Sequence, residues 1–405
     1  MTRLVVTVEA RFVRTPDGAT WTCGPPDRGF WDRYLTVFSG VRVVARVTEA
    51  QRRPPSATRV DGDRVEVWPV PYYVGSYQYL LRSRAVSRAV VASVGERDAV
   101  LLRVPSLLGT LLASRLSRVG HPYALEVIGD PHGVLAPGVV RHPLRPLLRQ
   151  WFTSRLRQQC RSAYGVAYIT ERYLQESYPP GADSLTTTYS SVDLPAGAFR
   201  AEPRSGKVEG EVPTLISIGS LEQMYKGIDT LIEAVALLTD SGMPVRLVHV
   251  GDGRFRPHLL DLATRLGVAG QITFRGLLPP GEPILAALDA ADLFVMPSRT
   301  EGQGRAMIEA MARGLPAIGS TAGGIPELLP PEYLVPPDNP AGLAASIRQL
   351  VTNPDRMAQA SARNLNRAHD FSASLLAERR TAFYQAIRMA TEDRAPTSVR
   401  RRVRR

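Results

Sequence analysis

Short apolar runs alternate with longer stretches of helical period along most of this chain. In the first half, β-branched and other apolar runs predict strands at residues 4–8, 41–47, 65–70, 99–104 and 123–128. Helical patterns lie between some of them, at residues 31–38 and 106–118, and the second repeats leucine at helical spacing. Strands that alternate with helices indicate a parallel sheet covered by helices.

The second half repeats this alternation more regularly. Apolar runs predict strands at residues 214–219, 245–250, 272–274, 293–296, 317–319 and 333–335. Helical patterns begin near residues 228, 256, 284, 304 and 341. We therefore expect two doubly wound α/β domains that face each other across a cleft, with ligands at the carboxyl ends of the strands.

The domain boundaries follow from composition. Residues 194–213 are rich in proline, glycine and charge and lack an apolar period, so they predict a linker. We expect an N-terminal domain over residues 1–193 and a C-terminal domain over residues 214–371. A last helix follows within residues 372–393. Residues 394–405, with six arginines and no acid, predict a disordered basic tail.

Charge and composition narrow the class of protein. The 405-residue chain carries a net charge of +12, and the excess lies in residues 1–193 and in the tail. Only Lys207 and Lys226 are lysines, so each is unusual for this chain. Two cysteines exclude a disulfide scaffold, and the longest charge-free stretch is too short to span a membrane. We expect a cytoplasmic protein without a specific nucleic acid partner, because no recognition motif accompanies the basic excess.

The segment with the most chemical information begins where the strand at 293–296 ends. Glu301-Gly302-Gln303-Gly304 forms a glycine-rich turn that leads into a helix. The unpaired N–H groups at such a helix start form an anion site. Glu309 follows ~7.5 Å further along the helix, and two carboxylates at this spacing suit hydroxyls on either side of a bound diphosphate. Gly323-Gly324 forms a second glycine turn at the next strand end.

These residues belong to an ordered set of motifs. The set comprises an E-x7-E pair (Glu301 and Glu309), Pro297-Ser298, Glu309-Ala310-Met311-Ala312, Gly314-Leu315-Pro316, Gly323-Gly324-Ile325-Pro326-Glu327, Ile218-Gly219-Ser220-Leu221, Tyr225-Lys226-Gly227 and Val250-Gly251-Asp252-Gly253. In this order and spacing the chain resembles glycosyltransferase family 4, the retaining enzymes of GT-B fold. The resemblance covers residues 214–350 with high specificity and residues 1–193 weakly. It implies two Rossmann-like domains and a last helix that crosses back to the N-terminal domain.

The resemblance also implies roles in the C-terminal domain. A nucleotide sugar, by default a UDP-sugar, would be the donor, with Glu309 on its ribose, Glu301 on its sugar and Lys226 on its diphosphate. The remaining donor-binding candidates are Gly219, Ser220, Gly251, Gly253, Arg275, Gly302, Gln303, Gly304, Arg305, Gly323 and Gly324. Ser220 stands where the family often has arginine, and Arg305 could supply the missing phosphate-binding cation. Neither a metal nor another cofactor is expected, because fixed positive charge and N–H donors would stabilise the leaving diphosphate.

In the N-terminal domain, His132 matches a family histidine near the donor sugar's primary hydroxyl. It is a catalytic candidate together with Glu301 and Lys226. Asp17-Gly18 lies where the family often has a glycine turn that faces the phosphates. Asp130 and Trp68 are further candidates for acceptor contact, and Trp68 belongs to an aromatic stretch that either stacks on a sugar or fills the core.

The acceptor stays open at this point. A lipid-linked or polysaccharide intermediate suits the basic N-terminal domain, whereas acids near its start suit a cationic natural product such as an aminocyclitol antibiotic precursor. Residues 141–161 hold six arginines, no acid and an apolar stripe, so their helix either lies on an anionic membrane or packs its stripe on the sheet. Two alternatives to a transferase remain: a nucleotide-sugar 2-epimerase of the same fold and a non-catalytic nucleotide-sugar-binding protein.

Overall fold

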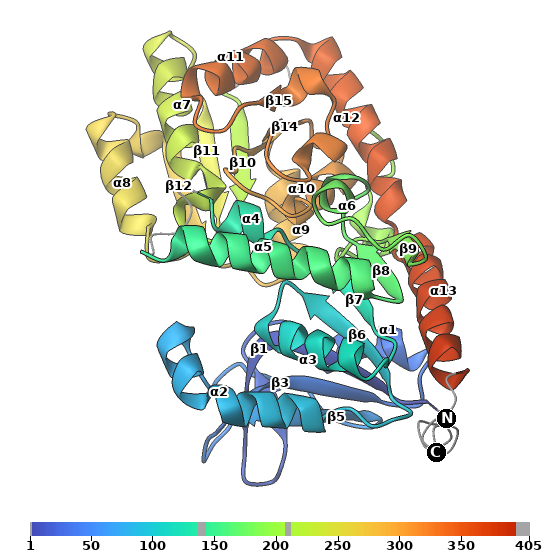
Figure 1. The fold of residues 1–405 in the computed structure, drawn as a ribbon. Helices are drawn as coiled ribbons and strands as arrows, with labels where there is room; N and C mark the ends of the chain where they lie inside the picture. Colours follow the sequence, from blue (N-terminus) through green and yellow to red (C-terminus); the bar gives the residue numbers. More distant parts are fainter. Residues whose placement is uncertain (1, 137–142, 207–211, 394–405) are drawn as a thin grey trace, which may run out of the picture.

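The computed structural model describes residues 2–136, 143–206 and 212–393. These residues form two α/β units, drawn one above the other in Figure 1, and each is built around a sheet of its own. Parts of three predicted segments lie outside the described residues: 207–211 of the linker, 141–142 of the basic helix and all of the tail at 394–405.

The N-terminal unit is built on a largely parallel sheet. Within the described ranges its strands are β1 (Leu4–Arg14), β2 (Thr20–Thr22), β3 (Val41–Glu49), β4 (Thr58–Arg59), β5 (Val65–Pro71), β6 (Ala99–Val104), β7 (Ala124–Val127), β8 (Gly165–Tyr168) and β9 (Leu185–Thr188). The order is β4-β2-β1-β6-β7-β8-β9, and β3 and β5 extend the sheet from the other side of β1. Only β2 pairs antiparallel in this described part, with β1 and with β4.

Helices cover both faces of this sheet. They are α1 (Asp32–Leu35), α2 (Gly75–Ala92), α3 (Leu107–Arg118), α4 (Pro131–Val134), α5 (Arg145–Ser162) and α6 (Tyr173–Ser177), joined by α13 (Ala373–Glu392) from the end of the chain. Successive residues of a strand point to opposite faces. Val5 of β1 therefore packs with α2, α3 and α5, whereas Leu4 and Val6 pack with α1 and α13.

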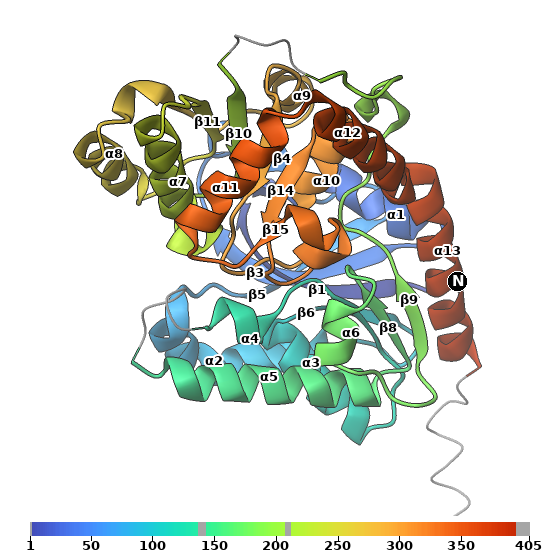
Figure 2. The ribbon, with the colours of Figure 1, turned by 90° about the horizontal axis from the view of Figure 1, so that it is seen from above.

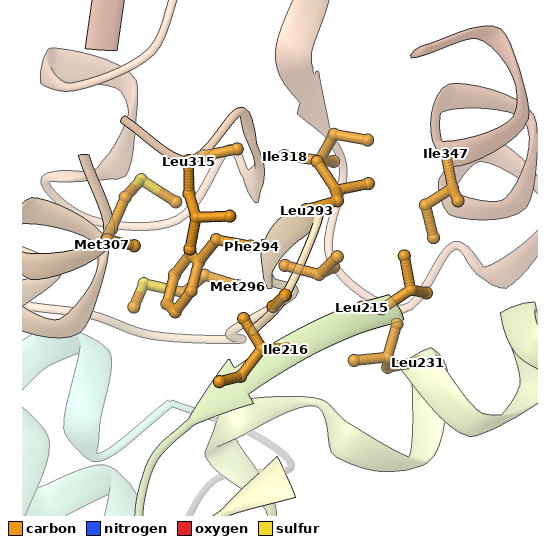
Figure 3. Packing of buried hydrophobic residues seen from close by; sticks show 14 of the residues in the cluster. Leu215, Ile216, Leu231, Leu293, Phe294, Met296, Met307, Leu315, Ile318 and Ile347 are labelled. Carbon is orange, nitrogen blue, oxygen red and sulfur yellow. The ribbon is translucent and has the colours of Figure 1, made fainter. Parts of the chain in front are cut away.

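The C-terminal unit has a fully parallel sheet in the order β12-β11-β10-β13-β14-β15. Its strands are β10 (Thr214–Ile218), β11 (Arg246–Val250), β12 (Ile272–Gly276), β13 (Leu293–Met296), β14 (Ala317–Ser320) and β15 (Leu334–Val335). Its helices are α7 (Ile228–Asp240), α8 (Arg256–Arg265), α9 (Glu282–Asp289), α10 (Arg305–Ala312), α11 (Pro340–Val351) and α12 (Pro354–Ala368). Figure 3 shows Phe294, Ile216 and Met307 within the buried core of this unit.

Short 3₁₀ helices connect several of these elements. They are η1 (Arg28–Trp31), η2 (Ala196–Ala198), η3 (Met224–Lys226), η4 (Ala269–Gln271), η5 (Ile325–Glu327), η6 (Pro331–Tyr333) and η7 (His369–Phe371). No helix in the described ranges is both long and apolar enough to cross a bilayer.

The predicted fold class, two Rossmann-like α/β domains, is confirmed, but the apolar pattern does not predict β2, β4, β8, β9, α2, α4, α6 or α12. The helix α12 buries Ser361 and Asn364 as well as small apolar residues. The Asn364 amide donates to the Leu315 carbonyl at 2.6 Å, so a hydrogen bond replaces apolar packing at that position. The buried positions of α12 still keep helical spacing, but only Met357 and Leu365 among them are large apolar residues.

The segment between the two sheets contacts both units. Leu194 bridges to Ser372 at the start of α13. Arg204 donates to the carbonyls of Ala291, at 2.6 Å, and Arg313, at 2.9 Å, in the C-terminal unit. Residues 194–206 are therefore held by specific contacts, and α13 runs beside the N-terminal sheet in both views (Figures 1 and 2).

Candidate active site

The loops that follow β10 and β11 lie against each other at the carboxyl edge of the C-terminal sheet. The Gly219 N–H donates to the Val250 carbonyl, and the Leu221 N–H donates to the Asp252 carbonyl, both at 2.9 Å. A Cβ at Gly251, whose φ is +143°, would lie 1.9 Å from the Gly219 carbonyl oxygen. Only glycine fits there, so these glycines bring the two loops into contact.

Lys226 and Glu301 meet at the same edge from two different loops. The Lys226 Nζ lies 2.6 Å from the Glu301 Oε2, and each side chain is 15% exposed. Lys226 ends the turn before α7, whereas Glu301 follows β13. The ammonium is therefore held in place before any ligand arrives, at a point where two strand ends converge.

The helix α10 begins directly after Glu301 and its glycine turn. Gly304 is its N-cap with φ of +87°, and no side chain caps its first turn. Glu309 lies one helical turn after Arg305, and among the described residues none donates a hydrogen bond to its carboxylate. Burial raises the pKa of Glu309, and the nearby Arg305 charge opposes this rise. A carboxylate without a partner, beside free helix N–H groups, fits a ligand that carries both hydroxyls and phosphates.

Gly323 and Gly324 support the Glu301 turn from behind. A Cβ at Gly323 would lie 1.8 Å from the Glu301 carbonyl oxygen. The Gly324 N–H donates to the Gly302 carbonyl at 3.1 Å. These two glycines therefore position the turn through close backbone packing.

His132 of the N-terminal unit reaches the same region. Arg149 donates to the His132 Nδ1 at 3.1 Å and to its carbonyl at 2.9 Å. Because arginine only donates, Nδ1 accepts, and the hydrogen of the neutral ring lies on Nε2. The loops of the two units touch here, since a Cβ at Gly133 would lie 2.7 Å from the Thr300 Oγ1. The fold thus brings His132 and Glu301 to facing loops.

Comparison with known proteins identifies the C-terminal unit. Residues 212–353 match the family described as Glycosyl transferases group 1. These residues form a glycosyl transferases group 1 domain. Its span includes Lys226, Glu301 and Glu309.

Relatives that match more of the chain than this domain are consistent with it. Protein CapJ of Staphylococcus aureus is 25% identical over 79% of this chain and 80% of its own length. The 2-deoxystreptamine glucosyltransferase of Streptomyces kanamyceticus is 28% identical over 62% of this chain and 66% of its own. A GDP-mannose-dependent alpha-(1-6)-phosphatidylinositol monomannoside mannosyltransferase of Mycobacterium tuberculosis is 35% identical over 54% of this chain and 56% of its own. The protein is a glycosyltransferase. The match spans less than two thirds of the length of the second and third of these relatives.

Solved structures extend the likeness to both units. The sucrose-phosphate synthase of Thermosynechococcus elongatus superposes with a TM-score of 0.69 at 18% identity, over 96% of this chain and all of that one. Alr3699/HepE of Anabaena, in complex with UDP and glucose, superposes with a TM-score of 0.65 at 17% identity, over 95% of this chain and all of that one. The likeness places the glycosyl transferases group 1 domain within the two-domain GT-B fold.

Three further donor-binding candidates, Ser220, Arg275 and Gln303, lie at different places in the loops of this domain. Ser220 accepts from the Glu222 N–H at 3.2 Å, and Arg275 is exposed at the end of β12. The Gln303 side chain is buried and accepts from the Ser190 hydroxyl of the N-terminal unit at 2.6 Å. Gln303 therefore joins the two units, whereas Ser220 and Arg275 stay open to a ligand.

Two of the N-terminal acceptor candidates, Asp130 and Asp17, have carboxylates that accept hydrogen bonds within the fold. The Asp130 carboxylate is buried and accepts from the N–H groups of His132 and Gly133 and from the hydroxyls of Tyr173 and Tyr178. Its acceptor sites are filled, so it holds the His132 loop. Asp17 accepts from Thr15 and from the Ala19 N–H within the β1–β2 turn, where Gly18 has φ of +83°.

Trp68 lies under α2 and not at the strand ends. Its indole N–H donates to the Ala89 carbonyl at 2.9 Å, and the Arg42 guanidinium stacks 4.7 Å from its ring centre. This position fits the core interpretation of Trp68, and its contact with an acceptor stays a prediction. An aromatic residue in mid-strand beneath a helix serves the core, and the pattern around residues 68–79 did not predict that helix.

Glu327 joins the two units, and the sequence analysis gave it no role. Its carboxylate accepts from the N–H groups of Glu171 at 2.5 Å, Arg172 at 3.1 Å and Tyr173 at 2.6 Å. Arg367 adds an ion pair with Glu171 at 2.9 Å. The signal available in the sequence was the position of Glu327 directly after the Gly323-Gly324 turn.

Proposed function

We propose that this protein is a retaining glycosyltransferase that moves a hexosyl group from a UDP-sugar, such as UDP-glucose or UDP-N-acetylglucosamine, to a hydroxyl of a saccharide acceptor. The meeting of Lys226 and Glu301 beside the uncapped start of α10 carries this proposal. Glu309, whose carboxylate has no donor among the described residues, would accept from the ribose hydroxyls. Gly251, Gly253 and Arg275 would border the base.

The diphosphate would lie between Lys226 and the first N–H groups of α10. Arg305, exposed at that helix start, would add the cation that Ser220 does not provide. Within the described residues, no three His, Cys, Asp or Glu side chains gather as ligands of a metal ion would. We propose that fixed cations and N–H donors stabilise the leaving diphosphate without a metal.

The reaction we propose proceeds on one face of the donor sugar. The bond between the anomeric carbon and the diphosphate oxygen breaks, and a bond to the acceptor oxygen forms on the same side. The acceptor proton passes to an oxygen of the leaving phosphate, so no protein nucleophile is needed. The Nε2–H of His132 would donate to a donor-sugar hydroxyl, and Glu301 would accept from another.

The acceptor class is a lipid-linked or polysaccharide intermediate, or a natural-product precursor of aminocyclitol type. The names of two relatives support these two choices: one acts on a phosphatidylinositol monomannoside and the other on 2-deoxystreptamine. The first of these also uses GDP-mannose. GDP therefore belongs beside UDP in a test of the donor.

Nucleotide binding tests the donor site directly. We expect UDP to raise the thermal unfolding midpoint of the wild type, with GDP, dTDP and ADP as comparisons, and Glu309→Ala to lose the rise. Glu282→Ala, a change at an exposed glutamate on α9, is the matched control and should retain it. If no nucleotide at millimolar concentration stabilises the wild type, the proposed donor site is wrong. Turnover of a UDP-sugar without a second sugar would favour the 2-epimerase, and binding without turnover would favour the non-catalytic protein.

A further inference from the structure

The first turns of α2 and α5 expose large apolar side chains. On α2, Tyr77 is 74% exposed and Leu81 is 70% exposed, with Leu80 beside them. On α5 and directly before it, Leu147 is 70% exposed, and Leu144 and Trp151 are also exposed. We call these six side chains, with the arginines of the two helices, the α2–α5 surface. Both helices pack on α3. Large apolar side chains exposed together at one end of neighbouring helices are typical of an interaction site.

Arginines continue the exposed apolar stripe along the helix, as α2 illustrates. Tyr77, Leu80, Leu81, Arg84 and Arg88 follow one another at helical spacing on α2. Among the described residues none accepts a hydrogen bond from Arg84 or Arg88. The two helices together hold eight arginines and no acidic residue. The α2–α5 surface therefore combines apolar contact with positive charge only.

The second half of α5 behaves differently. Leu156 and Cys160 are buried in the core against the sheet. The core interpretation of the basic segment thus fits the last turns of this helix. Near its start, by contrast, Leu147 is 70% exposed.

The α2–α5 surface borders the candidate active site. Both helices begin at the carboxyl edge of the N-terminal sheet, since α2 follows β5 and α5 follows α4 after β7. In both views their first turns lie on the same side of the N-terminal unit (Figures 1 and 2). Arg149 of α5 donates to the ring and to the carbonyl of His132, so this surface contacts a proposed catalytic residue.

We propose that the α2–α5 surface docks the protein on an anionic lipid bilayer. Leucine, tyrosine and tryptophan would enter the interface between headgroups and acyl chains, and the arginines would pair with lipid phosphates. A second copy of this chain would set arginine against arginine. A nucleic acid would satisfy the arginines but leave Leu80, Leu81 and Leu147 in water.

Docking in this way brings the candidate active site close to molecules anchored in the membrane. It selects the lipid-linked acceptor among those proposed above, and that selection rests on the proposed function. The docking itself does not depend on the identity of the donor.

Vesicle binding by the full chain tests the proposal. We expect the wild type to sediment with vesicles of phosphatidylcholine and phosphatidylglycerol, and much less with phosphatidylcholine alone. Leu81→Ser with Leu147→Ser should lower the affinity for the anionic vesicles roughly tenfold, because two inserted side chains are lost. Leu277→Ser, at a leucine 78% exposed after β12, is the matched control and should bind as the wild type does.

Arginine changes separate this surface from the basic tail. Arg84→Gln with Arg88→Gln should weaken binding several-fold, whereas Arg265→Gln at the end of α8 should not. All of these variants keep the six arginines of residues 394–405. The proposal is overturned if the wild type does not bind anionic vesicles. It is also overturned if the double serine variant binds them as well as the wild type does. The nucleotide shift of the same samples without vesicles reports separately on the donor site.

Discussion

At the scale of single residues, the charge in the strand-end loops comes from a few side chains, and one of them is of a residue type that is rare in this chain. Lys226 is one of only two lysines, and its pairing with Glu301 places a compact charge where a diphosphate would lie. Ser220 leaves a place without charge, and Arg305 is the exposed cation nearest to Glu309 along α10. The first prediction concerns this replacement.

Arg305→Ala should raise the KM for the donor several-fold and leave kcat nearly unchanged. The reason is that a binding cation is lost while Lys226 still faces the leaving group. Steady-state kinetics with varied donor measures both constants. Because Arg305 is exposed, its loss should leave the thermal midpoint unchanged, as should the control Arg265→Ala. An unchanged KM for the donor would show that Arg305 does not bind the diphosphate.

The buried ring of His249 should make stability depend on pH. Its Nε2–H donates to the Gly219 carbonyl at 3.0 Å, and its Nδ1 has no partner among the described residues. Burial lowers the pKa of His249 to about 4, and the Lys226 charge acts in the same direction. The unfolded ring, with its ordinary pKa near 6.5, binds a proton first, so the free energy of unfolding should fall as pH drops from about 6.5 to about 4. The loss is on the order of 3 kcal/mol.

Urea unfolding across that pH range measures the effect. His249→Gln should flatten the slope, because the titrating group is gone. His258→Gln, at an exposed histidine on α8, should keep the slope of the wild type. Equal slopes in wild type and His249→Gln would show that other groups cause the pH dependence.

At the scale of elements, α13 is fixed to the N-terminal sheet by a buried charge. Glu126 of β7 accepts from Arg103 at 2.9 Å and from the hydroxyls of Tyr189 at 2.9 Å and Tyr384 at 3.1 Å. Tyr34 completes the cluster, and burial and the Glu126 charge raise its pKa to about 12. These phenols stay protonated at neutral pH and can donate to the carboxylate.

Removing the carboxylate should cost far more than removing one phenol. Glu126→Leu leaves Arg103 buried without its counter-charge and should lower the free energy of unfolding by about 3–5 kcal/mol. Tyr384→Phe removes one hydrogen bond and should cost about 1 kcal/mol. Chemical denaturation measures both, with Tyr164→Phe at an exposed tyrosine as control. Tyr384→Phe that matches this control would mean that the Tyr384 hydrogen bond does not help to hold α13.

At the scale of the whole molecule, the two units are held together beside the site rather than at a distance from it. Glu327 binds three N–H groups at the start of α6, and Gln303 accepts from Ser190. The turn that carries Glu301 lies between these two contacts in space, since Gly324 donates to the Gly302 carbonyl. The relative position of the units and the shape of the turn are therefore linked.

Glu327→Ala should loosen the contact between the units. We expect a larger radius of gyration in solution scattering and a donor KM raised several-fold, because the closed cleft is less populated. Glu332→Ala, five residues along and exposed, is the matched control. If scattering and KM both stay at the values of the wild type, Glu327 does not hold the units together.

The alternation of strands and helices can be predicted from the sequence alone, and so can the place of the strand-end loops that carry Lys226, Glu301 and Glu309. Both are local properties: period 2 and period 3.6 come from backbone geometry, and glycines with acids at fixed spacing mark strand-end turns. Lys226, Glu301 and Glu309 could be chosen in this way because their neighbours along the chain form motifs. The apolar pattern does not predict β2, because three residues are too few to show a period. It does not predict α12, because only two of the buried positions in that helix are large apolar residues.

Contacts between residues that lie far apart in the sequence can be seen in the folded structure alone. Tyr384 reaches Glu126 across 258 residues, and no pattern along the chain links them. Glu327 binds backbone N–H groups, which every residue type except proline provides, so its partners carry no sequence signal. Asp130 and Trp68 have the residue types of a binding site, yet their hydrogen bonds are used within the fold. Burial and partner choice depend on packing in three dimensions, and those decide whether a polar side chain serves a ligand or the protein itself.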